Sequence, residues 1–181
     1  VYQELTRITK AIKDGDFFSN PVLCGVMQQV VKKDSALHLL GLVSDGGVHS
    51  HLDHVYGLLE LAKKSGVKKV YIHAFLDGRD VPPSSALEYI TALEKKAAEI
   101  GVGRIATVAG RYYAMDRDKR WERTVKAYDA LVTREGEHAA SAEEAVKKAY
   151  ERQVTDEFVL PTVVDTCGEC GVNAGDGLIF F

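Results

Sequence analysis

Apolar runs and amphipathic stretches alternate along most of this chain, and that alternation restricts the fold more than any other feature of the sequence. Residues 36–43, 69–76 and 104–109 are short, nearly continuous apolar runs. Such runs are typical of strands that are covered on both faces. Helical patterns at 51–64 and 84–100 separate them, so we predict an α/β fold, a three-layer domain with a mainly parallel sheet flanked by helices.

Further elements are predicted on both sides of this unit. Val1, Leu5, Ile8 and Ile12 recur at helical spacing, and Asn20 before Pro21 is typical of the start of a second helix. Later in the chain the patterns predict helices at about 119–132 and 141–152 and strands at 158–164 and 178–181.

The length and the two ends of the chain concern its domain organisation. With 181 residues, 46% of them hydrophobic and 27% charged, the chain has an ordinary globular composition for one domain. It starts inside a helical pattern and ends in an apolar strand. We therefore expect residues 1–181 to be a single α/β domain excised from a larger protein.

The net charge and the cysteine content indicate which binding partners and which cellular compartment to expect. The formal net charge of −3 gives no general attraction to nucleic acid or to an anionic membrane. No apolar run approaches the roughly 20 residues of a membrane span, and no signal peptide opens the chain, so a cytoplasmic location is expected. Cys24, Cys167 and Cys170 are too few for a disulfide framework, and we predict two free thiols in the loop that holds Cys167 and Cys170.

Polar loops follow the three central strands at residues 44–51, 77–80 and 110–118. Ligands of open parallel sheets bind beyond the carboxyl ends of the strands, so these loops are expected to share one rim. Arg79, Arg111 and Arg117 would converge there. Because the guanidinium fork suits phosphate and carboxylate, three arginines at consecutive strand ends indicate a phosphorylated acid as ligand.

Each of these residues also has an ordinary structural alternative. The arginines could be surface ion-pair partners of Asp80, Asp116 and Asp118. Asp80 could exchange a proton with a substrate hydroxyl, or it could serve as a turn or helix-capping aspartate. The sequence leaves both alternatives open.

The segment His49-Ser50-His51-Leu52-Asp53-His54 raises a different possibility. Its H-x-H-x-D-H spacing also occurs in metallo-β-lactamase-like hydrolases, which need further ligands from later loops. The later histidines are His73, inside a predicted strand, and His138. Without a metal, His51 and His54 are expected to be capping and solvent-facing residues, and His38 and His73 to belong to the core.

Three segments resemble one known family. SDGGVHSH (44–51), DGRDVPP (77–83) and GRYYAMDRDKRWER (110–123) closely resemble the 2,3-bisphosphoglycerate-independent phosphoglycerate mutases, in order and spacing over residues 1–133. The resemblance implies a two-domain isomerase that interconverts 3-phosphoglycerate and 2-phosphoglycerate through a phosphoserine. This chain looks like its substrate-holding domain, so the alkaline-phosphatase-like metal domain of the same protein is missing.

The resemblance also carries residue roles and a cofactor. It implies that His49, Arg79, Asp80, Arg111 and Arg117 hold the phosphoglycerate and that Asp80 is the acid/base for its hydroxyls. Two manganese ions are implied for the intact enzyme, none of them bound by this domain, and no 2,3-bisphosphoglycerate is required. By the same resemblance the chain alone is expected to be inactive. A monomer is expected, and the net charge predicts no nucleic-acid or membrane partner.

Overall fold

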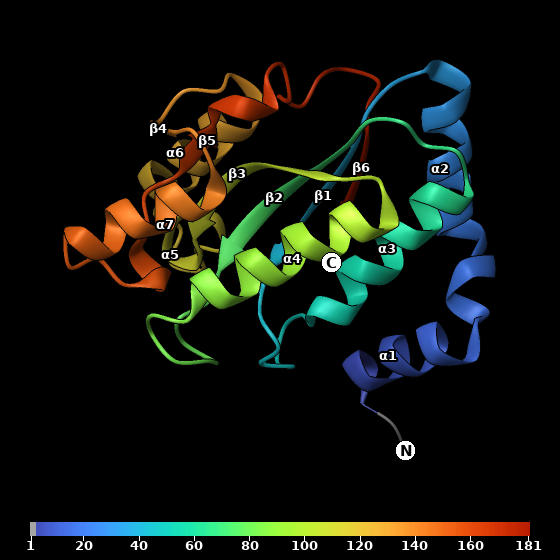
Figure 1. Ribbon diagram of the computed structural model, residues 1–181, viewed down its shortest axis with the longest axis horizontal. Helices are drawn as coiled ribbons and strands as arrows, with labels where there is room; N and C mark the ends of the chain where they lie inside the picture. Colours follow the sequence, from blue (N-terminus) through green and yellow to red (C-terminus); the bar gives the residue numbers. More distant parts are fainter. Residues whose placement is uncertain (1–2) are drawn as a thin grey trace.

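The computed structural model describes residues 3–181, and its sheet has six strands in the order β4-β5-β3-β2-β1-β6 (Figure 1). β6, β1, β2 and β3 are mutually parallel, whereas β5 is antiparallel to β3 and parallel to β4. The mainly parallel sheet is therefore confirmed. The strands are β1 (Leu37–Leu42), β2 (Val70–Leu76), β3 (Arg104–Gly110), β4 (Glu137–Ala139), β5 (Thr162–Val164) and β6 (Gly177–Phe180).

Helices cover both faces of the sheet and make the predicted three layers. On one face Leu39 and Ile72 pack under α3 and α4, which Figure 1 shows lying across the sheet. On the other face Leu40 and Phe75 pack against Leu131 of α6. The α-helices are α1 (Glu4–Asp14), α2 (Pro21–Lys33), α3 (Leu52–Lys64), α4 (Ala86–Ile100), α5 (Arg111–Ala114), α6 (Trp121–Val132) and α7 (Ala142–Glu151).

Capping residues begin several of these helices where the sequence predicts it. Asn20 Oδ1 accepts hydrogen bonds from the amides of Val22 (3.0 Å) and Leu23 (3.2 Å) at the start of α2. Ser141 Oγ accepts one from the amide of Glu144 (3.1 Å) at the start of α7. Val1, the first residue of the predicted leading helix, lies outside the described residues. Helix α1 begins at Glu4.

The last third of the chain departs from the predicted elements. In place of one strand at 158–164, a short 3-10 helix η2 (Asp156–Phe158) precedes the three-residue strand β5. β4 and the one-turn helix α5 were not predicted, because segments this short carry no readable hydrophobic period. None of the helices within residues 3–181 has both the length and the apolar character that a membrane crossing requires.

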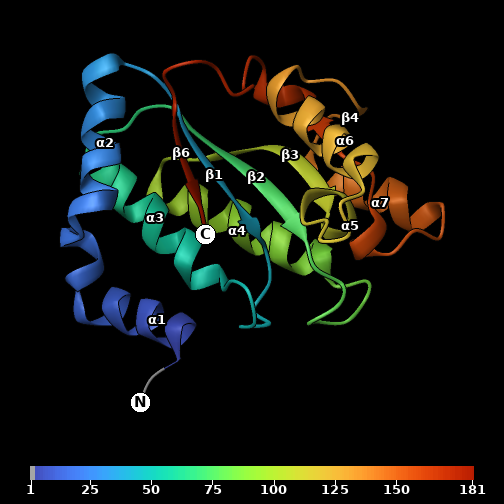
Figure 2. The ribbon, with the colours of Figure 1, turned by 180° about the vertical axis from the view of Figure 1, so that it is seen from behind.

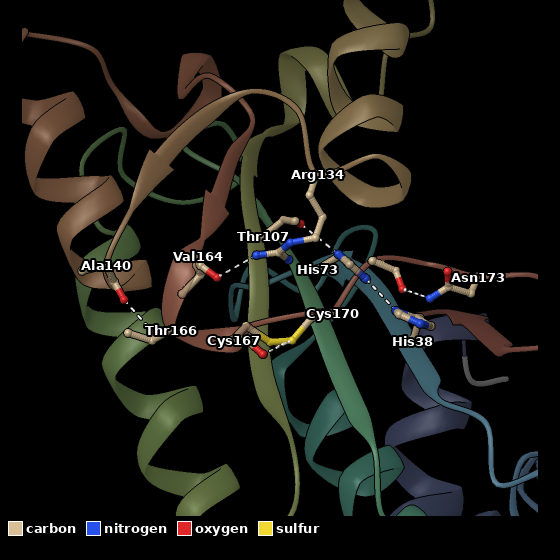
Figure 3. The surroundings of a disulfide bond; sticks show 11 residues. His38, His73, Thr107, Arg134, Ala140, Val164, Thr166, Cys167, Cys170 and Asn173 are labelled. Carbon is tan, nitrogen blue, oxygen red and sulfur yellow. Dashed lines mark hydrogen bonds between the residues drawn. A yellow bond between two sulfur atoms is a disulfide. The ribbon is translucent and has the colours of Figure 1, made fainter.

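Buried polar side chains form a row of hydrogen bonds across the sheet, on the face that α6 covers. His38 Nδ1 lies 2.9 Å from His73 Nε2, and His73 Nδ1 lies 2.9 Å from Thr107 Oγ1. His38 Nε2 is 3.1 Å from a carboxylate oxygen of Asp176, which can only accept. With both imidazoles neutral, Thr107 donates to His73, His73 to His38, and His38 to Asp176. The prediction that both histidines belong to the core is confirmed (Figure 3).

The buried His38 and His73 predict that the folded protein loses stability at acidic pH. Burial, His38 and the charge of Arg134 lower the pKa of His73 to about 3, and burial lowers the pKa of His38. Between that value and the ordinary pKa of about 6.5, the unfolded state binds more protons than the folded state. The free energy of unfolding therefore has its full value above about pH 6.5. Below that pH, proton uptake by His73 on unfolding should by itself lower it by about 1.4 kcal/mol per pH unit.

Urea unfolding at pH 7.5 and 5.0 measures this loss. We expect His73→Gln to be less stable at pH 7.5 but to lose less stability on acidification than the wild type. Equal losses in the two proteins would contradict the assignment.

Candidate functional site

The loops after β1, β2 and β3 leave the sheet at one edge, as a parallel arrangement requires (Figures 1 and 2). Asp77, the residue directly after β2, is buried at their centre with 3% of its surface exposed. Its carboxylate accepts hydrogen bonds from Ser44 Oγ (2.7 Å) and from the amides of Arg79 (3.2 Å) and Asp80 (3.0 Å). Asp77 therefore joins the first loop to the second and fixes the turn that presents Arg79 and Asp80.

Glycines allow the second and third loops to pass close to the segment around η2. Gly78 adopts φ +62°, and a Cβ there would stand 2.8 Å from the Asp156 Cβ. At Gly110, the end of β3, the Glu157 carbonyl leaves no room for a Cβ. Arg111 thus follows β3 directly and begins α5.

Arg111 is buried between two carboxylates. Its Nη1 donates to Asp77 Oδ1 (2.6 Å) and to Asp80 Oδ2 (2.7 Å), and only 7% of its side chain is exposed. Within residues 3–181 its Nη2 and Nε make no hydrogen bond, so they remain as donors for an anion. Asp80 likewise uses only Oδ2 among the described residues, and Oδ1 stays open as an acceptor.

The electrostatic balance at Asp77 keeps this residue ionised. Burial would raise its pKa, but hydrogen bonds from the amide of Asp80, the Ser44 hydroxyl, Arg111 and the amide of Arg79 outweigh it and lower the pKa. Asp77 therefore holds Arg111 as a permanent anion and has no proton to offer near neutral pH.

Four of the five predicted site residues line one cavity of about 480 Å³. His49, Arg79, Arg111 and Arg117 all line it. Asp80 is not among the lining residues, but it is bonded to Arg111, and its Oδ2 lies 3.9 Å from His49 Nε2. The remaining lining residues are Tyr112, Ala114, Met115, Asp116, Asp118, Arg123, Glu157 and Phe180.

The alternative of ion pairs with Asp80, Asp116 and Asp118 holds for one of the three arginines among the described residues. Arg111 does pair with Asp80, and Arg79, with 59% of its side chain exposed, pairs with Glu157 at 3.4 Å. Arg117, in contrast, is exposed and has no ion pair within the described part of the chain. Its charge is available to a ligand.

Arg123 is a site residue that sequence reasoning missed. It pairs with two of the carboxylates considered as partners of the three predicted arginines, because its Nη1 lies 3.2 Å from Asp116 Oδ1 and 3.5 Å from Asp118 Oδ2. Its guanidinium carbon lies 3.8 Å from the Tyr112 ring centroid. Arg123 belongs to the GRYYAMDRDKRWER segment, but sequence does not reveal which arginine folds back over Tyr112. Glu157 carries no sequence signal at all.

The four side chains of the H-x-H-x-D-H segment do not gather around one point. His51 caps α3, with Nδ1 accepting from the amide of Asp53 at 3.1 Å, whereas His49 faces Asp80. His54, expected to face solvent, is buried, and its Nε2 bonds Thr9 Oγ1 at 2.9 Å. That expectation was wrong because α1 covers this part of α3. Across residues 3–181 no three His, Cys, Asp or Glu side chains are placed to hold a metal ion.

The two cysteines predicted as free thiols form a disulfide instead, Cys167–Cys170 (Figure 3). Gly168 between them adopts φ 71° and ψ −136°, a conformation that glycine alone reaches readily. That turn brings the two side chains together, which a count of cysteines cannot reveal.

Comparison with known proteins gives one consistent result. The family model described as "BPG-independent PGAM N-terminus" matches residues 8–181. The 2,3-bisphosphoglycerate-independent phosphoglycerate mutases of Clostridium beijerinckii and Moorella thermoacetica are 62% and 59% identical to the chain, which is covered entirely but spans only 36% of each relative. A crystal structure of Leishmania mexicana phosphoglycerate mutase at low cobalt concentration matches 97% of the chain with a TM-score of 0.90 and 33% identity, over 34% of its own length.

Proposed function

Because this chain belongs to the family of 2,3-bisphosphoglycerate-independent phosphoglycerate mutases, as part of their N-terminal region, we propose that it is the substrate-holding domain of such an enzyme. The reaction would be the interconversion of 3-phosphoglycerate and 2-phosphoglycerate, a step of glycolysis and gluconeogenesis. The observation that carries the proposal is the convergence of His49, Arg79, Arg111 and Arg117 on one cavity.

The charge pattern of the cavity supports a small, multiply charged acid. Arg117 offers an uncompensated charge, and Arg111 offers N–H groups that its two carboxylates leave free. A volume of about 480 Å³ suits a small ligand. Arg79 is exposed, and Glu157 is its only ion-pair partner within residues 3–181, so it can exchange that partner for the ligand.

Asp80 is proposed as the acid/base for the glycerate hydroxyls. Its Oδ2 is fixed by Arg111, and its Oδ1 points to no donor within residues 3–181. A substrate hydroxyl can donate to that free oxygen and pass its proton to it as the phosphoryl group arrives. The phosphoryl group leaves one hydroxyl and returns to the other, and the glycerate must stay bound meanwhile. The side chains of this cavity would hold it during that exchange.

The metals and the nucleophile are proposed to lie outside this chain. Residues 3–181 do not provide a three-ligand cluster, so the proposed pair of manganese ions fits the remaining part of the enzyme and not this domain. When bound there, manganese would supply positive charge to the transferring phosphoryl group. The name of the relatives supports a reaction that needs no 2,3-bisphosphoglycerate.

A second partner is proposed to be the rest of the same polypeptide. A cavity of about 1060 Å³ lies between α1, α3 and β6, and exposed apolar side chains border it. Ile8 is 40% exposed, Val48 57% and Phe180 60%. Such a surface suits a neighbouring domain better than water. We propose a monomeric enzyme in the cytoplasm, and the net charge of −3 supports the absence of nucleic-acid or membrane partners.

Family membership decides against the metallo-β-lactamase-like alternative. That alternative needed His49, His51, Asp53 and His54 at one metal centre, and they are spread between a cavity, a helix cap and the core.

A turnover assay tests the division of labour between the two parts. We expect the purified chain with manganese to convert no 3-phosphoglycerate, as followed by ³¹P NMR, because the nucleophile is absent. The same assay on the full-length enzyme is the positive control. Sustained conversion by the chain alone would contradict the proposal.

A further inference from the structure

Neither cysteine of the Cys167–Cys170 disulfide lines the arginine cavity, and the disulfide lies on the sheet face that carries the buried histidines (Figure 3). It packs against Ala106 and Tyr71, where β3 bulges beside β2. Nothing in the proposed function uses it. Its surroundings nevertheless contain two features that ordinary structural disulfides do not need.

The first feature is the unequal exposure of the two cysteine residues. Cys170 is fully buried, whereas Cys167 retains 9% exposure and lines a cavity of about 300 Å³. Arg104 lines the same cavity. Glu94 lines this cavity as well, so a small thiolate that enters beside Arg104 meets charges of both signs. It can reach Cys167 there, whereas Cys170 is protected.

The second feature is a buried cationic donor without a partner. Arg134 Nη2 donates to the carbonyl of Val164 (3.2 Å), but Nη1 is buried and makes no hydrogen bond among the described residues. The Arg134 stem runs beside Gly171, the residue after Cys170, since a Cβ on Gly171 would stand 3.4 Å from Arg134 Cγ. A buried unpaired guanidinium N–H is costly, and the Arg134 side chain passes next to the residue that follows Cys170, so a thiolate formed on Cys170 would lie near this positive charge.

From these observations we propose that Cys167–Cys170 is a reversible redox site that exchanges electrons with low-molecular-weight thiols. A thiolate attacks Cys167 Sγ, the S–S bond breaks, and Cys170 leaves as a thiolate that Arg134 stabilises. A second thiolate attacks the sulfur of the first reagent in the mixed disulfide, which releases the Cys167 thiolate and the oxidised reagent. Two electrons pass from two small thiols to the protein, and each released thiolate can take a proton from water.

The equilibrium is measured in the Cys24→Ser background, so that all signal comes from the pair. The chain is incubated with graded ratios of reduced and oxidised glutathione at pH 8, and its free thiols are then alkylated. Mass spectrometry gives the fraction in which the pair is reduced. We expect one two-electron transition, with the same midpoint from either direction and with unchanged near-ultraviolet circular dichroism. Thiols that never form the disulfide, or a disulfide that is reduced only when the protein unfolds, would overturn the proposal.

Arg134→Met tests the role of the guanidinium, and Arg152→Met, on the surface beside Glu137, is the matched control. We expect Arg134→Met to shift the equilibrium about tenfold toward the disulfide, as for a thiolate pKa raised by about one unit. An equal midpoint in both variants would overturn this part.

Single-cysteine variants give a readout that does not depend on Arg134. In the same background, the thiol left in Cys170→Ser should react with an aromatic disulfide reagent at least about tenfold faster than the thiol left in Cys167→Ser, because only the first lines the cavity. Equal rates, or the reverse order, would contradict attack at Cys167.

Discussion

Replacement of Arg111 by alanine is expected to lower the free energy of unfolding by about 3–5 kcal/mol and to abolish phosphoglycerate binding. Arg111 is the sole cation bonded to Asp77 in the described residues, and Asp77 is 3% exposed. Removing the cation leaves the Asp77 carboxylate buried without a counter-charge, and an unpaired buried charge strongly destabilises the folded state. The loop that presents Asp80 loses its anchor at the same time.

Urea unfolding of the chain measures the loss, with Arg79→Ala as the matched control. Arg79 carries the same charge in the same cavity, but it is 59% exposed and paired only at 3.4 Å. Its replacement should cost less than about 1 kcal/mol. Similar stabilities of the two variants would show that Arg111 does not organise the strand ends.

Asp80→Asn in the full-length enzyme is expected to lower kcat by about 10²- to 10⁴-fold with little change in KM. Asparagine keeps the size of the side chain and can still accept from Arg111, but it cannot take a proton from the substrate hydroxyl. The loss should therefore fall on the chemical step.

Asp118→Asn is the control for this variant, because Asp118 is a second aspartate at this site: it lines the cavity and has 73% of its side chain exposed. Its kcat should stay within a few-fold of the wild type. If Asp80→Asn turned over at a comparable rate, Asp80 would be a positioning residue and not the acid/base.

Sequence periodicity was sufficient for the part of the fold that is regular. The central strands are buried on both faces, so their apolar runs were unambiguous, and a parallel order then forced Arg79 and Arg111 to the same edge. Elements of three or four residues, such as β4 and α5, have too few positions for a period to show.

The parts that sequence did not reveal depend on contacts between distant segments. Asp77 becomes the centre of the site only because Ser44 and Arg111 reach it from other strands. Glu157 joins the cavity because glycines let the η2 segment pass close by. His54 is buried by α1, whose position no local pattern fixes. The sequence thus predicts which side chains lie close together only where the order of the parallel strands is sufficient to place them.

Titration of the chain with 3-phosphoglycerate by calorimetry tests the central claim most directly, with Arg117→Met compared against Arg120→Met. Both arginines are exposed and only three residues apart, but Arg117 alone lines the cavity. We predict weak binding that Arg120→Met leaves unchanged and Arg117→Met weakens about 10- to 100-fold, as for one lost charged hydrogen bond. Equal affinities for the two variants, or no heat of binding in the wild type, would contradict a phosphoglycerate site at these strand ends.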